Sequence, residues 1–247
     1  MPDFSTAPAG WTVDRYAPDS FSNVGTYQGA TNVLGIGIGA NGAAANRGGE
    51  SDQFYDTQGE GYIISGAAGD SLSADVYIPA SWLNASNGAV RTDMWGVMTD
   101  STSTISDYPI MGFTNEGTGG YVGFQVWDDT LNAGNGGWME LGASGNTNSW
   151  NALSIDFTGT DFLYFLNGVQ VYDQSNTFGS VDFSEVIMQA YNFDDPANFP
   201  SAVADPYTAY WANADSVPVP EPGTIALLLS GLGLAAFFGY RRRSSKI

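Results

Sequence analysis

The sequence contains no cysteine and no histidine, and its one lysine, Lys246, lies next to the last residue. Without cysteine, the chain has no disulfide framework, no thiol nucleophile and no thiolate metal site. The lack of histidine excludes a Ser-His-Asp mechanism and His-ligated zinc, and upstream of the tail there is no lysine to form a Schiff base. Any enzyme chemistry on this chain would have to rely on carboxylates.

The sequence also contains few cations, and most of them lie at the C-terminus. Residues 1–220 contain three of them, Arg15, Arg47 and Arg91, against 25 carboxylates, which gives this part of the chain a net charge of −22. A field of that sign repels nucleic acid and anionic lipid, so we expect neither as a partner of these residues. It suits divalent cations or neutral glycans, although an acidic surface also serves solubility alone.

No pattern for a helix of ordinary length occurs before residue 217. Short segments with alternating apolar and polar residues, such as 71–78 and 153–158, are separated by Gly, Asn, Asp and Ser. Asn167-Gly168 gives the strongest hairpin signal, because this pair suits the type I′ turn that matches strand twist. About a dozen such strands predict an all-β, two-sheet antiparallel jelly-roll sandwich over residues 11–216, after a lead-in of residues 1–10.

The C-terminal 31 residues have a different composition. Residues 217–223 form a proline-rich linker, residues 224–240 are 17 residues without a charge, and residues 241–247 are basic. At 1.5 Å per residue the uncharged run extends about 25 Å, which is the short end of a bilayer span. We therefore predict a transmembrane helix over 224–240 with a cytoplasmic basic tail. The alternative, a buried helix of a soluble domain, would be amphipathic and would not end in a cluster of cations.

The order of these three features resembles the PEP-CTERM sorting signal. The matching residues are Pro220, Glu221, Pro222, Arg241, Arg242 and Arg243. The resemblance implies processing by a membrane-embedded exosortase, anchoring in the inner membrane before processing, and a final place at the cell surface or in the extracellular matrix of a Gram-negative bacterium. The first residues show neither a basic start nor an apolar run, so we expect the export leader to be missing from this sequence.

Upstream, the segments WTVDRY, SADVYIP, MWGVM, FLYFLNGVQVYD, VIMQAYNF and YWAN follow one another over residues 11–217. Their order resembles the concanavalin-A-like lectin/glucanase superfamily, in its laminin-G-like branch. The resemblance implies a concave sheet face that binds carbohydrate, a structural calcium nearby, and first and last strands that lie side by side. The Glu-x-Asp-x-x-Glu motif of the glucanases is missing, since SADVYIP carries only Asp75 and Asp93 has no acidic partner close in sequence. We therefore expect no enzyme activity.

Candidate carbohydrate ligands lie on the polar faces of the expected strands, where Arg91 also lies. Aromatic rings stack on sugar rings, and amides and carboxylates bond to hydroxyls. The candidates are Asp93, Trp95, Asn115, Gln125, Trp127, Gln189 and Tyr191. For each of them, simple packing in the sheet is the alternative.

Two acidic clusters are candidate calcium ligands, because calcium takes six to eight oxygen ligands. One is Asp128 with Asp129, and the other is Asp194 with Asp195, Asn198 and Asp205. Adjacent acids in a loop are also often only solvated.

The sequence therefore predicts an exported protein that binds carbohydrate or exopolysaccharide through its sandwich domain. Two alternatives from other classes stay open. One is a structural matrix or biofilm scaffold without sugar binding, and the other is a glycoside hydrolase or lyase that uses Asp75 or Asp93.

Overall fold

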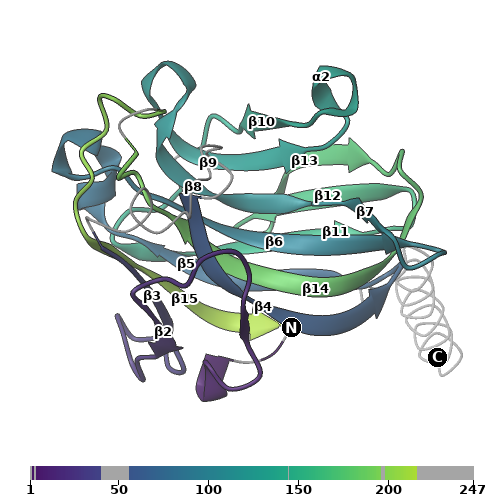
Figure 1. Cartoon of the computed structure of the whole chain (residues 1–247), viewed down its shortest axis with the longest axis horizontal. Coiled ribbons are helices and arrows are strands. Elements are labelled where there is room, and N and C mark those ends of the chain that lie inside the picture. Colours follow the sequence, from purple (N-terminus) through teal and green to yellow (C-terminus); the bar gives the residue numbers. More distant parts are fainter. Residues whose placement is uncertain (1, 3, 40–55, 144, 196–197, 216–247) are drawn as a thin grey trace, which may run out of the picture. The chain divides into compact units, whose positions relative to one another are not determined.

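Alternating apolar side chains build two antiparallel sheets in the computed structural model, which describes residues 2, 4–39, 56–143, 145–195 and 198–215 (Figure 1). The predicted all-β, two-sheet antiparallel sandwich is confirmed. In Figure 1 the long strands of both sheets run across the view in nearly the same direction, as in aligned sheet packing.

Sheet A holds eight strands and sheet B seven. The spatial order of sheet A is β1 (Thr12–Val13), β4 (Thr57–Ala67), β14 (Ser180–Tyr191), β6 (Arg91–Asp100), β8 (Ile110–Gly117), β9 (Tyr121–Asp128) and β10 (Gly137–Glu140), and β7 (Ile105–Asp107) also pairs with β6. The order of sheet B is β13 (Val169–Ser175), β12 (Asp161–Leu166), β11 (Ser149–Phe157), β5 (Ser71–Ile78), β15 (Tyr207–Asp215), β3 (Leu34–Ile38) and β2 (Ser20–Asn23).

The helical elements in the described residues are short. They are the 3₁₀ turns Phe4–Thr6, Ala80–Leu83, Ala85–Asn87 and Thr118–Gly120, and the single turn α2 (Leu131–Gly134). In residues 2–215, masked positions aside, no helix is both long and apolar enough to cross a membrane. The predicted helix over 224–240 lies outside the described residues.

The core lies between the two sheets. Sheet A contributes every second residue of β6, β8, β9 and β14, including Met94, Phe113 and Phe124, and sheet B contributes Ile155 and Trp211 among others. Because side chains alternate along a strand, residues between these positions point away from the core. The outer face of sheet A, defined by those intervening residues, is where the tryptophans of the middle strands gather.

The Asn-Gly turn forms as predicted. Asn167 and Gly168 both have positive φ values, 53° and 77°, and they join β12 to β13. A type I′ turn needs a positive φ at both central positions, which Asn and Gly tolerate best.

The prediction that the first and last strands lie side by side is wrong. Strand β1 pairs with β4 in sheet A, whereas β15 lies between β5 and β3 in sheet B. The WTVDRY segment forms only two strand residues, and its indole, Trp11, packs against Phe4, Phe21 and Tyr62.

Candidate functional site

Strand register places a row of large apolar side chains across the outer face of sheet A. In neighbouring strands, Ile187 pairs with Trp95, Trp95 with Ile110, Ile110 with Trp127, and Trp127 with Trp138. These side chains form an apolar cluster separate from the core between the sheets. Trp95, Ile110 and Ile187 are buried within this cluster, whereas Trp127 and Trp138 are half-buried.

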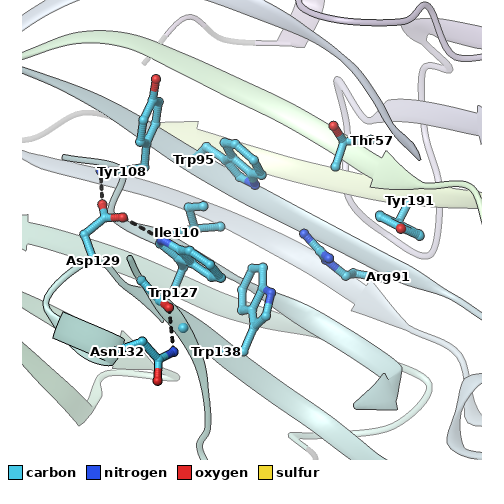
Figure 2. Close-up of a pocket in the computed structure, with 12 residues that line it drawn as sticks. Thr57, Arg91, Trp95, Tyr108, Ile110, Trp127, Asp129, Asn132, Trp138 and Tyr191 are labelled. Atoms are coloured by element: carbon cyan, nitrogen blue, oxygen red, sulfur yellow. Dashed lines mark hydrogen bonds between the residues drawn. The ribbon is translucent and has the colours of Figure 1, made fainter. Parts of the chain in front are cut away.

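Four members of this row, all except Ile187, line a cavity of about 500 Å³, here called the cleft. Its lining residues are Thr57, Arg91, Trp95, Tyr108, Ile110, Trp127, Asp129, Asn132, Gly136, Gly137, Trp138 and Tyr191. In Figure 2, Tyr108 and Asp129 lie at one end of the cleft, Arg91 and Tyr191 lie at the other, and the three tryptophans lie between them. The two ends therefore differ in charge.

At the positive end, Arg91 is held by both aromatic and acidic neighbours. Its guanidinium carbon lies 4.4 Å from the ring centroid of Trp138 and 5.0 Å from that of Tyr191. Its Nε donates to Asp93 Oδ2 at 2.7 Å, and Gln189 Nε2 donates to the same oxygen at 3.1 Å. Stacking and hydrogen bonding together fix the orientation of the guanidinium.

Asp93 lies beneath Arg91 and is fully buried. Its other oxygen, Oδ1, has no hydrogen-bond partner among the described residues. Gly112 on the next strand leaves the space that this carboxylate fills, because a Cβ there would collide with both Asp93 Oδ1 and the carbonyl oxygen of Thr92. Asp93 therefore supports Arg91 from below and does not reach the cleft surface.

At the acidic end, Asp129 positions Trp127. Its Oδ1 accepts a hydrogen bond from Trp127 Nε1 at 2.7 Å, and its Oδ2 accepts one from the backbone N–H of Tyr108 at 2.6 Å (Figure 2). Behind it, burial and then the hydrogen bond and charge of Asp129 raise the pKa of Asp107 to about 9. Asp107 is thus protonated at neutral pH.

The structure brings six of the seven predicted carbohydrate ligands to the outer face of sheet A. Trp95, Trp127 and Tyr191 line the cleft, whereas Asp93, Gln125 and Gln189 are buried in the layer below it. Asn115 is not on this face. It shares the strand parity of Met111 and Phe113, which face the core, and it bonds to the backbone of Val90 and Gly88.

Two prominent residues of the cleft were absent from the predicted ligand set. Trp138 lies on a strand of four residues, too short to show an alternation, and only its pairing with Trp127 reveals its role. Arg91 belonged to the predicted polar face but was not among the ligands. The scarcity of cations in residues 1–220 was the signal that could have singled it out.

The predicted calcium ligands are placed as follows. Both oxygens of Asp128 accept hydrogen bonds, from Thr130 and from Tyr172 Oη, and Asp195 is buried and bonded to Asn198. Asp194 is half-buried and Asp205 is exposed. Among the described residues, no group of three or more acidic side chains is placed to hold a metal ion. Calcium binding stays a prediction, which the Tm in calcium and in chelator would test.

The two carboxylates considered for catalysis lie in different sheets. Asp75 is on β5 of sheet B, where it accepts a hydrogen bond from Asn213, and Asp93 is on β6 of sheet A. A glycosidase needs its two carboxylates on either side of one bond, about 5–10 Å apart. Residues on separate sheets, each on the outward side, do not form such a pair.

Residues 218–243 match the family model described as the PEP-CTERM protein-sorting motif. The C-terminal segment is a PEP-CTERM protein-sorting motif. The motif includes Pro220, Glu221, Pro222 and the three arginines 241–243, as the sequence indicated. A PEP-CTERM motif implies an exported, surface-directed protein that an exosortase processes.

Upstream of the PEP-CTERM motif, the domain is similar in fold to known jelly-roll proteins. A glycoside hydrolase family 16 endo-glucanase from Bacteroides ovatus shares 13% identity over 87% of this chain and 98% of its own, with a TM-score of 0.57. A second family 16 structure from the same organism, with bound product, has a TM-score of 0.58 at the same identity and coverage. At this identity the likeness shows the fold alone. No curated protein matches the chain in sequence.

Proposed function

We propose that the sandwich domain binds carbohydrate in the cleft and does not cleave it, and that the sorting motif delivers the domain to the cell surface or extracellular matrix. The observation that carries the proposal is the cleft itself. Trp95, Trp127 and Trp138 line a cavity of about 500 Å³ on the outer side of sheet A, in an apolar cluster separate from the main core between the sheets.

The chemistry of these walls suits a sugar. Indole faces stack on the apolar face of a pyranose ring, and polar groups at the edges bond to its hydroxyls. The cleft offers such groups at both ends, in Arg91 and Thr57 on one side and in Asn132, Tyr108 and Asp129 on the other. Asp129 holds the Trp127 indole by its N–H, so this wall is fixed before a ligand arrives.

The placement of acidic side chains favours binding over cleavage. Among the described residues, Asp129 is the one carboxylate that lines the cleft, and both of its oxygens already accept hydrogen bonds from the protein. Asp93 is fully buried beneath Arg91. A general acid and a base or nucleophile would both have to reach the glycosidic bond.

The test is a binding screen of the purified full chain against soluble neutral and acidic polysaccharides, with calcium and with chelator. In parallel, the same mixtures are assayed for new reducing ends and for the unsaturated products of a lyase. We expect saturable binding without release of product. The two calcium conditions show whether a bound ion supports binding.

Each other outcome identifies one of the alternatives. A folded protein that binds no polysaccharide in the screen would contradict the proposal and favour the structural matrix or biofilm scaffold. Release of product that is lost in Asp93→Asn, at an unchanged Tm, would establish a glycoside hydrolase or lyase instead.

A further inference from the structure

The cations in the described part of the domain both lie on one face of one sheet. Arg15 and Arg91 are the two cationic side chains in the part of the chain that the structure describes, and both stack on tryptophans of the outer face of sheet A. The guanidinium carbon of Arg15 lies 4.7 Å from the ring centroid of Trp95. Residues 1–220 hold 25 carboxylates, and these two cations lie on the face that carries the cleft.

The Arg91 guanidinium has hydrogen-bond donors that the described residues do not use. Its Nε is used by Asp93, but neither terminal nitrogen has a hydrogen-bond partner among the described residues. The side chain keeps 14% of its surface exposed, whereas Asp93 keeps none. The two terminal NH₂ groups present a planar donor edge, which matches the two oxygens of a carboxylate.

We infer that the cleft recognises an acidic sugar, and that Arg91 binds the carboxylate of a uronate residue; this inference rests on the proposed carbohydrate binding. Figure 2 shows the guanidinium between Trp138 and Tyr191, and both rings contact it. The sugar ring then lies over the tryptophans. Its carboxylate lies at the Arg91 end, away from the charge of Asp129.

Asp93 and Gln189, which lie beneath Arg91, orient its guanidinium before a ligand binds. Little side-chain entropy therefore remains to be lost when the uronate arrives. The acidic remainder of the domain repels a polyanion at long range, but at physiological salt the Debye length is about 8 Å. The direct contact between Arg91 and one carboxylate therefore decides the preference.

The experiment compares polyuronates with their own neutral forms. Polygalacturonate, polymannuronate and polyglucuronate are each carboxyl-reduced, which replaces the carboxylate by a hydroxymethyl group and keeps the linkage. Binding of the full chain at physiological salt and neutral pH is measured by affinity gel electrophoresis and calorimetry. A sulfated neutral galactan is included as a second anionic probe.

We expect the wild-type chain to bind at least one polyuronate about tenfold or more tightly than its reduced form, which corresponds to about 1.4 kcal/mol. Arg91→Lys keeps the charge but loses the planar fork, so it should lose most of this preference. Because removing Arg91 alone leaves Asp93 buried without its cation, the double variant Arg91→Gln/Asp93→Asn serves as a second test. It should bind both forms of the polymer equally.

The outcomes separate this inference from the proposed function. If the wild type binds polyuronates and their reduced forms with equal affinity, carbohydrate binding stands and the uronate assignment is overturned. Preference for the sulfated galactan over every polyuronate would overturn the carboxylate assignment too. A folded wild-type chain that binds none of the probes would contradict both proposals.

Discussion

Both sheets carry an aromatic cluster on the outer face, but the two clusters are built differently. On sheet A, Trp95, Trp127 and Trp138 surround a cavity. On sheet B, Tyr77, Trp150 and Tyr210 project from three strands, and Tyr27 from the loop after β2 stacks on Tyr210 at 3.8 Å between ring centroids. The rings of the second cluster pack on one another.

The difference shows that aromatic content alone does not make a site. On sheet B the loop residue Tyr27 covers the strand residues, and the backbone carbonyl of Gln28 accepts the N–H of Trp150 at 3.1 Å. On sheet A, Arg91 and Asp129 lie at the two ends of the tryptophan row, and the row lines a cavity. The cluster on sheet B therefore provides matched controls for the cleft.

The largest effect we expect concerns the glycine beneath the cleft. Gly112→Ala places a Cβ against the carbonyl oxygen of Thr92, which is backbone and cannot swing away, so it should cost about 1–3 kcal/mol of stability. The control is Gly37→Ala on the outer face of sheet B, where the new Cβ meets the rotatable hydroxyl of Ser20. Thermal or urea unfolding of both variants measures the contrast, and an equal loss would contradict it.

Truncating one tryptophan in each cluster is the sharpest test of function. Trp138→Ala removes a wall of the cleft and the ring that stacks on Arg91, so carbohydrate affinity should fall about tenfold or more, or about 1.4 kcal/mol. Trp150→Ala removes the same side chain from sheet B and should leave affinity unchanged. Calorimetry on both folded variants decides this, and similar losses in the two would place the binding surface elsewhere.

The carboxyl pair at the acidic end predicts a pH dependence of stability. Because the pKa of Asp107 is raised to about 9 from an ordinary value of 3.8, the folded chain holds a proton that the unfolded chain releases, and stability falls as pH rises between these values. Asp107→Asn mimics the protonated form. It should raise the Tm by about 3 °C or more near pH 8, with a gain that shrinks toward pH 4.

Melting curves of Asp107→Asn between pH 4 and pH 8 test whether ionisation of Asp107 causes the effect. Asp75→Asn, which changes an acid on sheet B, is the control. A gain for Asp107→Asn that is constant with pH would show that ionisation of the pair is not its cause.

The smallest effect should come from unstacking the cluster on sheet B. Tyr210→Leu removes the ring on which Tyr27 stacks, and should cost about 0.5–1.5 kcal/mol of stability. Because no carbohydrate contact is expected there, affinity for the glycan should not change. A loss of affinity at unchanged stability would mean that the loop around Tyr27 takes part in binding.

Local patterns predicted much of this fold. The alternation over residues 71–78 placed Leu72, Ala74 and Val76 in the core, and the Asn-Gly pair fixed one hairpin. The strand order could not be predicted, because β14 pairs with β4 on one side and with β6 on the other. Both of these strands lie far from β14 in the sequence. Such long-range pairings depend on how whole sheets pack, and this leaves no local signal.

The candidate site was partly predictable, because the alternation of side chains along a strand can be read from the sequence. Strand parity alone brings Asp93, Trp95, Gln125 and Trp127 to one face of a sheet. Parity does not tell which of these reach solvent, and Asp93 and Gln125 are covered by their neighbours. The pairing of Trp138 with Trp127 also required the structure, since it joins two strands whose register the sequence does not show.

The place of β15 in sheet B has a mechanical consequence. This strand ends at Asp215, and the sorting motif begins three residues later. Any tension on the C-terminal segment therefore enters the domain through a strand hydrogen-bonded on both sides, to β5 and to β3. An edge strand such as β2 would be peeled from one neighbour, whereas extracting β15 would break two ladders and remove Trp211 from the core.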